Sequence, residues 1–204
     1  MRRQTYVKSV RGNPGFWRKA ALMFCGIMVA VLLAGYQRPL VSASQPINVA
    51  VLDYAIPSSA AVTGQTASRY AADDLAAKLS HVSHPQLTVV SRKAVRDAEA
   101  SLGWKMADLV SFDRLAQLAQ NVGANYLFLG RIQSITPPGG GGGAAYGATV
   151  SITVFDAAAK NSLGSATGNG LAGATGGRDT AVRGALSNAN AKALPALIAK
   201  LPTP

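Results

Sequence analysis

Few residues in this chain could take part in chemistry, and its two histidines are the first to consider. His81 and His84 form an H-x-x-H pattern at the end of an expected helix, and this spacing can bring two imidazoles onto one face. A metal site needs a third and a fourth ligand. No other histidine occurs, and the single cysteine, Cys25, lies in an apolar block near the amino terminus. We therefore interpret both histidines as solvated loop residues, with an adventitious metal contact as the alternative, and predict no metal site.

The acidic residues offer one candidate for a ligand contact. Asp73 and Asp74 are neighbours on an expected helix, so their side chains diverge by about 100° and cannot work as a carboxylate pair. Asp53 ends a buried strand, where open α/β sheets bind ligands. A polar contact with the neighbouring loop is the interpretation we favour for it. The sequence has no G-x-S-x-G elbow, and no catalytic residue is predicted.

Two glycine-rich segments and one aromatic residue complete the candidates. Residues 168–173, GNGLAG, match G-x-G-x-x-G, but no acid follows Asp179 and no second parallel strand follows the last helix. We interpret this segment as a glycine-rich loop and predict no cofactor. The run Gly139–Gly143 lacks the GK[ST] of a phosphate loop and is expected to be a linker or hairpin tip. Trp104 could bind a partner, but we expect it to cover the core.

The positive charge is concentrated at the amino terminus. The net charge is +11, and six of the twenty bases lie in the first nineteen residues, before the first acid. The other bases are dispersed and not interleaved with aromatic residues, which argues against nucleic-acid binding. About half of the residues are hydrophobic and 14% are charged, a composition typical of a compact core.

The basic segment leads into an uncharged apolar block at residues 20–36. As a helix this block would extend roughly 25 Å, slightly less than a hydrocarbon core of about 30 Å. Val41-Ser42-Ala43 follows, which completes the pattern of a secretory signal peptide with cleavage after Ala43. An uncleaved signal anchor in the inner membrane is the alternative. Either reading places residues 44–204 in the periplasm or otherwise outside the cytoplasm, with membrane contact only through residues 1–43. Phe24 before Cys25 argues against lipidation.

The rest of the sequence, residues 44–204, predicts a single α/β domain with a mixed sheet. A buried strand is expected at 47–54, because INVAVLDY is apolar on both faces. Alternating and apolar segments predict the other strands, and 3.6-residue periodicity predicts the helices. The expected order is β-α-β-α-α-β-β-β-α. The further strands are expected at 87–91, 126–135, 146–156 and 163–170, and the helices at 65–80, 92–102, 112–122 and 180–201.

Several positions within these elements carry specific expectations. Ser111 is the expected N-cap of the third helix and Gly123 its left-handed stop. Asp179 or Thr180 is expected to cap the last helix, and Pro195 to kink or split it. The buried face of the first helix is expected to comprise Ala67, Ala71, Leu75 and Leu79. That of the third helix is expected to comprise Phe112, Leu115, Ala116, Ala119 and Val122, and that of the last helix Val182, Leu186, Ala189, Ala193 and Leu197.

Four segments in order resemble the CsgG-like family of curli assembly and transport proteins. These segments are VAVLDY (49–54), YAADDLAAKLS (70–80), LTVVSR (87–92) and VGANYLFLGRI (122–132). The family includes penicillin-binding-protein activators and flagellar or envelope accessory lipoproteins, and the amino-terminal domain of TolB-type proteins is similar in layout. The resemblance covers about residues 47–201. It implies a periplasmic α/β domain for protein–protein assembly, with no catalytic residue to carry over.

The expected function is therefore that of an exported cell-envelope accessory or assembly protein, not an enzyme. It would bind other envelope proteins, possible homo-oligomers included, and no nucleic acid. The alternative is a periplasmic module that binds a small molecule or a peptidoglycan fragment in the crevice beyond Asp53 and Gly130. The connections are too short for the long hairpins of a secretion pore.

Overall fold

The computed structural model describes residues 46–56, 64–83, 86–139 and 145–202. The predicted signal segment and its cleavage after Ala43 lie outside these residues. The described residues form a mixed α/β domain, which confirms the expected fold class. Its elements are β1 (Ile47–Val51), α2 (Gly64–Ser80), β2 (Leu87–Val89), α3 (Arg92–Ser101), a 3-10 helix η2 (Met106–Val110), α4 (Phe112–Val122), β3 (Tyr126–Thr136), β4 (Ala145–Asp156), β5 (Asn161–Gly173), a short η3 (Ala174–Gly176) and α5 (Arg178–Ile198).

The five strands in the described part of the chain form one sheet in the order β2-β1-β3-β4-β5. β1 lies between β2 and β3 and is parallel to both, whereas β4 pairs antiparallel with β3 and with β5. The helical connections before β3 permit parallel pairing, and the direct connections after it give antiparallel pairing. The sheet is therefore parallel at one side and antiparallel at the other.

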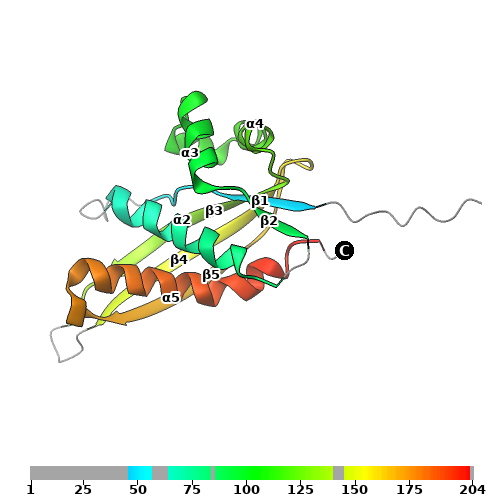
Figure 1. Ribbon diagram of the computed structural model, residues 1–204. Helices are drawn as coiled ribbons and strands as arrows, with labels where there is room; N and C mark the ends of the chain where they lie inside the picture. Colours follow the sequence, from blue (N-terminus) through cyan, green and yellow to red (C-terminus); the bar gives the residue numbers. More distant parts are fainter. Residues whose placement is uncertain (1–45, 57–63, 84–85, 140–144, 203–204) are drawn as a thin grey trace, which may run out of the picture. The chain divides into compact units, whose positions relative to one another are not determined.

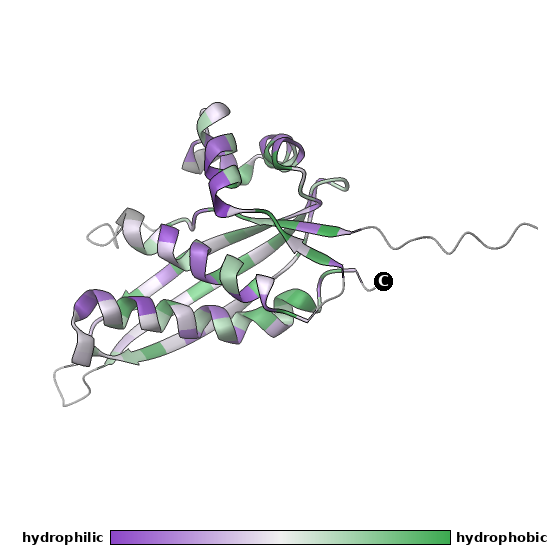
Figure 2. Ribbon diagram, viewed as in Figure 1, coloured by the Kyte–Doolittle hydropathy of each residue, from purple (hydrophilic) through white to green (hydrophobic). Residues whose placement is uncertain are grey.

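Helices cover the two faces of the sheet unequally. α2 and α5 lie side by side over one face (Figure 1), and their apolar residues pack with those of β1, β3 and β4 in the larger core. α3 and α4 lie on the opposite face, where a smaller core forms beneath them. Alternation along β1 divides its residues between the two cores, with Val49 and Val51 in the first and Ala50 and Leu52 in the second. Figure 2 shows the matching alternation of hydropathy along β4.

The predicted helix caps of α4 are both present. The Ser111 hydroxyl accepts a hydrogen bond from the backbone N–H of Arg114, and Gly123 has a left-handed φ of 68°. The four buried positions expected on α2 and the five expected on α5 are buried. Periodicity therefore identified the core-facing sides of the two helices that cover the larger core.

Other local expectations were wrong or incomplete. Phe112 is 53% exposed, because its ring lies beside Phe155 at the rim of the smaller core rather than within it. Ala116 and Val122 are only half-buried on α4, while Leu115 and Ala119 are buried as expected.

The ends of several elements also differ from expectation. The N-cap position of α5 is occupied by Gly177, which has no side-chain capping bond, so neither Asp179 nor Thr180 caps it. α5 continues through Pro195 to Ile198 and is not split. The strand expected at 47–54 ends at Val51, although Leu52 and Tyr54 remain buried.

The segment 168–173 is not a loop but the second half of β5. Gly168 and Gly170 lie directly under α5, where a Cβ atom on either would fall on the carbonyl oxygen of Ala189 or Ala185. These glycines let the helix backbone approach the strand backbone closely. The glycine spacing serves helix–strand packing, which corrects the loop interpretation.

Candidate functional site

Asp53 lies just beyond the carboxyl end of β1, in a network of charged side chains. Arg92, at the start of α3, donates to the Asp53 carboxylate and to the carbonyl of Val51. Its Nε also donates to Asp73 of α2 at 2.9 Å, and Arg69 lies 3.7 Å from Asp53. Parallel pairing of β1 and β2 brings Asp53 and Arg92 to the same edge of the sheet. Asp53 thus makes a polar contact, as expected, but its partners lie on the two flanking helices rather than on the neighbouring loop.

A small hollow adjoins this network on the α3 side. It has a volume of about 260 Å³ and is lined by Asp53, Glu99, Ala100, Gly103 and Trp104. The volume is below the ~300 Å³ at which pockets for drug-sized ligands begin. Burial, and next the negative charge of Asp53, raise the pKa of Glu99 from its ordinary value of 4.5 to about 7. The hollow thus offers one acid that titrates near neutrality beside another that is held in ion pairs.

Glu99 is expected to make the fold less stable as the pH rises from about 4.5 to about 7. The folded chain keeps the Glu99 proton in this window while the unfolded chain has lost it, so unfolding is favoured by increasing pH. The glutamate is partly exposed, and we expect the loss to be about 1–2 kcal/mol after solvent screening. Glu99→Gln should remove this loss, so that the variant exceeds the parent in urea stability at pH 8 but not at pH 4.5. If the free energy of unfolding changed equally with pH in parent and variant, the raised pKa of Glu99 would be contradicted. Asp97→Asn, which changes an exposed acid of the same helix, is the control.

The expected crevice beyond Gly130 is filled by the ring of Tyr54. A Cβ atom at Gly130 would overlap three ring carbons of Tyr54, and Tyr54 itself is fully buried. Gly130 thus makes room for an aromatic ring in the larger core. The part of the predicted crevice that involved Gly130 was wrong, and only the hollow beside Asp53 remains.

Tyr54 begins a buried polar network between β1, α2 and α5. Its hydroxyl donates to Oδ1 of Asn190 at 2.9 Å. Nδ2 of Asn190 donates to the carbonyl of Ala71 and to Oδ2 of Asp74, each at 2.9 Å. Asp74 also accepts from Lys78 at 2.6 Å. Burial, reinforced by the charge of Asp74, raises the pKa of Tyr54 well above its ordinary value. The network ties the two helices over the larger core, and sequence reasoning missed it.

The adjacent acids of α2 diverge as predicted. Asp73 bonds to Arg92 and Arg96 on the α3 side, whereas Asp74 bonds to Lys78 and Asn190 towards α5. Each acid has cationic or amide partners of its own. Together they hold α2 to α3 and to α5.

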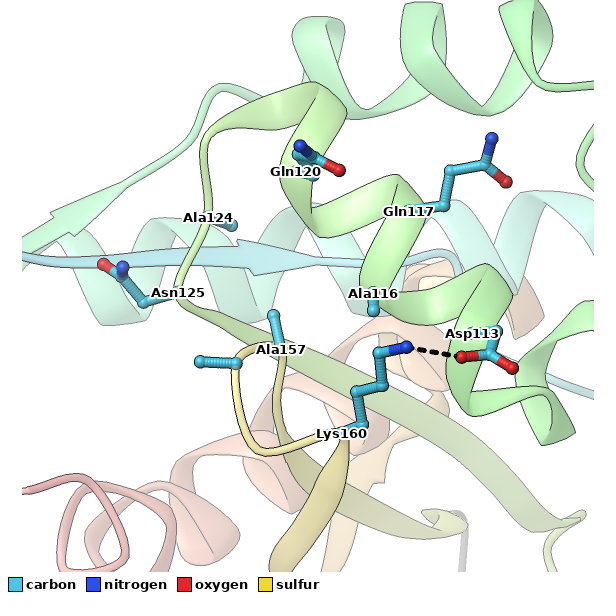
Figure 3. Close-up of a pocket in the computed structure, with 9 residues that line it drawn as sticks. Asp113, Ala116, Gln117, Gln120, Ala124, Asn125, Ala157 and Lys160 are labelled. Atoms are coloured by element: carbon cyan, nitrogen blue, oxygen red, sulfur yellow. Dashed lines mark hydrogen bonds and ion pairs between the residues drawn. The ribbon is translucent and has the colours of Figure 1, made fainter.

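A second hollow, of about 560 Å³, lies between α4 and the turn that joins β4 to β5. Figure 3 shows Lys160 and Asp113 directed at each other, at 2.7 Å, while Gln117 and Asn125 lie at separate ends of the hollow. Asn125 is also occupied structurally, since its side chain accepts from the Asn48 backbone N–H at 2.9 Å. The polar groups do not converge on a common point, so we assign no site to this hollow.

The remaining candidates from the sequence do not form a reactive site. His81 is exposed at the end of α2, and His84 lies outside the described residues. Trp104 packs against the smaller core as expected, with the Arg114 guanidinium 5.9 Å from its ring centroid. From residue 140 on, the Gly139–Gly143 run is not described. Among the described residues, no group of three or more histidine, cysteine or acidic side chains could hold a metal ion.

One half of the sheet has a face that the described helices leave open. Apart from Phe155 in the smaller core, the buried side chains of β4 and β5 point to α5, and their neighbours point the other way. Arg131, Ser151 and Thr167 form one row across this face, as the strand registers show. We refer to it as the open face, and it comprises Arg131, Thr149, Ser151, Thr153, Ser165, Thr167, Asn169 and Leu171. Its groups are five hydroxyls and one amide, with one arginine and one exposed leucine. These eight residues suit binding and include no nucleophile–base pair.

Comparison with known proteins shows a shared fold without a shared sequence. No family model and no curated protein matches this chain. The solved structure of lipoprotein GNA1162 from Neisseria meningitidis aligns with a TM-score of 0.50 and 16% identity, over 76% of this chain and all of that one. The hypothetical protein CT253 from Chlamydia trachomatis aligns at 0.47 and 12%, covering 76% and 95%. The LpoB C-terminal domain from Salmonella enterica aligns at 0.41 and 17%, covering 63% and 85%.

The GNA1162 alignment shows that the described domain contains the whole fold of that lipoprotein. At 16% identity it shows the fold alone. None of these three structures is described as a CsgG-like or TolB protein, so that resemblance stays a hypothesis. In the part of the chain that the structure describes, no helix is both long enough and apolar enough to cross a membrane.

Proposed function

We propose that this chain is an exported accessory protein of the cell envelope that binds other envelope proteins and catalyses no reaction. The observation that carries the proposal is the open face. Apart from Arg131 and Leu171, it presents uncharged polar side chains on the sheet, while the charged side chains around Asp53 are engaged with one another. The signal-like segment at residues 1–43 and the CsgG-like motifs support the same interpretation. The fold it shares with the lipoprotein GNA1162 is consistent with placement in the envelope.

Site-specific crosslinking tests this proposal. A photo-reactive residue at Ser151 or Thr153 should crosslink the full chain to an envelope protein in intact cells, identified by mass spectrometry. The same residue at Asp97, an exposed position on α3, should give a much weaker product. Absence of a crosslink from the open face, or equal crosslinking from Asp97, would remove the support for this surface. A crosslink between two copies would instead support the homo-oligomer.

The hollow beside Asp53 favours a second candidate, a module that binds a small ligand or peptidoglycan fragment. Its volume suits a single small group. Asp53→Ala would break the Arg92 ion pair, so Trp104→Leu and Glu99→Gln are the better variants. A wall fragment that raises the Tm of the parent but of neither variant would establish this module. No shift across a panel of fragments would exclude it.

A further inference from the structure

The two edges of the sheet differ greatly in length. β2, at one edge, has three residues, and β5, at the other, has thirteen. After the irregularity at its start, β5 keeps an unbroken register with β4 from Gly164 to Gly173. A long and regular edge strand exposes a row of backbone groups that can pair with another strand.

The hydrogen bonds of β3 identify which β5 groups face outwards. The carbonyls of Phe128 and Gly130 accept from Leu52 and Ala55, so even-numbered residues of β3 bond towards β1 and odd-numbered ones towards β4. The odd-numbered residues of β3 pair with odd-numbered residues of β4, so the even-numbered residues of β4 bond towards β5. These pair with even-numbered residues of β5, whose backbone groups therefore bond to β4. The N–H and C=O groups of the odd-numbered residues therefore point away from the sheet. They belong to Ser165, Thr167, Asn169, Leu171 and Gly173.

This free edge carries few of the features that protect edge strands. β5 contains no charged residue and no proline, and its bulge lies at the beginning, near Gly164. Asn188 of α5 donates to the Leu171 carbonyl at 2.8 Å, which occupies that one acceptor. Among the described residues, no side chain bonds to the outward backbone groups of Ser165, Thr167 or Asn169. Three consecutive outward pairs are thus available over the middle of the strand.

The position of α5 excludes a second copy of this chain as the natural occupant. α5 lies directly above β5, with Ala185 and Ala189 over Gly170 and Gly168. Antiparallel pairing of two β5 strands about a two-fold axis would bring the two α5 helices within about one strand spacing of each other, ~4.8 Å. Packed helices need about 8–10 Å. A single extended segment has no such helix and fits beside β5.

We propose that the free edge of β5 adds a strand from a partner protein, as an extended segment hydrogen-bonded to Ser165, Thr167 and Asn169. The inference rests on the proposed function and names where and how a partner binds. Lys200 lies over Gly164, and Lys192 follows Asn188 by one helical turn on α5. We therefore expect the partner segment to consist of uncharged β-forming residues, with one acidic side chain directed towards α5.

Thr167→Pro is the sharpest variant for testing the edge. The Thr167 N–H points outwards, so proline removes a donor for the added strand and leaves the β4–β5 bonds in place. Thr167→Val keeps the donor and is the matched control. Thr167→Lys, which puts a charge on the edge, replaces the proline variant if circular dichroism shows that the latter is unfolded.

The probe is a capped nonapeptide of alternating valine and threonine with a central glutamate, added to the full chain. Amide hydrogen exchange should show at least about tenfold slower exchange at Ser165, Thr167 and Asn169 when the peptide is bound. Thr167→Pro or Thr167→Lys should weaken binding at least about tenfold, and Thr167→Val should leave it unchanged. A peptide with prolines at its third and sixth positions should not bind.

Four results would overturn the inference. The first two are equal peptide binding by the proline and valine variants, and no slowing of amide exchange at millimolar peptide. The other two are slow exchange of the three amides without peptide, and slow exchange that depends on the concentration of the chain. The last two would mean that another part of the chain, or a second copy, occupies the edge. If Thr167→Pro retains its envelope crosslinks from Ser151 but the peptide fails, the proposed function stands and the strand-addition site falls.

Discussion

Replacing Gly168 with valine is expected to destabilise the domain by more than about 3 kcal/mol. A Cβ atom at this position would fall on the carbonyl oxygen of Ala189, and a backbone carbonyl in a helix cannot move aside as a flexible side chain can. α5 would have to lift from β5, which would open the larger core over Val150 and Ile152. Overpacking typically costs ~1–3 kcal/mol, and displacement of a covering helix adds to that cost.

Gly173 supplies the matched control for this substitution. It lies on the same strand with no atom within 4 Å of an added Cβ and without a positive φ, so Gly173→Ala should change the free energy of unfolding by less than about 0.5 kcal/mol. Urea unfolding followed by circular dichroism measures both variants. A Gly168→Val domain as stable as Gly173→Ala would show that α5 does not rest on this strand.

Replacing Asn190 with leucine is expected to cost about 3–5 kcal/mol. Asn190 is fully buried and bonds to Tyr54, Asp74 and the Ala71 carbonyl. Leucine would leave a buried hydroxyl, a backbone carbonyl and a carboxylate oxygen without this partner, and each buried unsatisfied group costs about 1–3 kcal/mol. The loss falls on the contact between α2 and α5, so thermal unfolding should show a large decrease in Tm.

Two further variants distinguish the network from ordinary packing. Asn188→Leu removes a single bond from an exposed side chain and should cost about 1 kcal/mol or less. Tyr54→Phe combined with Asn190→Leu should cost less than the sum of the two single changes, because the hydroxyl left unsatisfied by the leucine is then absent. Additive costs in this double-mutant cycle would refute the coupling.

The sequence predicted best what depends on neighbouring residues. Ser111 and Gly123 were recognised because caps use local side-chain and backbone chemistry. The buried sides of α2 and α5 followed from periodicity, since each helix has one apolar face. A polar contact of Asp53 with the neighbouring loop was expected, but its principal partner is Arg92 of α3, which becomes a neighbour only when β1 pairs with β2.

The features that were missed depend on residues far apart in the chain. Tyr54 and Asn190 are separated by 136 positions, so no local pattern relates them. By propensity alone the glycines of β5 suggest a loop. Their role is to let α5 approach the strand closely, and this contact is between residues distant in sequence. Gly130 was assigned to an opening because nothing in the sequence indicates that the Tyr54 ring covers it.

The dependence of the larger core on α5 has a consequence for how the chain folds during synthesis. All five strands precede α5, and this helix covers β4 and β5 through contacts that no earlier helix replaces among the described residues. Until it has been synthesised, the valines and isoleucine of β4 have no cover on that side, and the free edge of β5 lies beside them. A ribosome-bound intermediate that lacks residues 178–198 would therefore expose apolar surface and tend to aggregate. Folding of this sheet is therefore completed only after α5 has been synthesised.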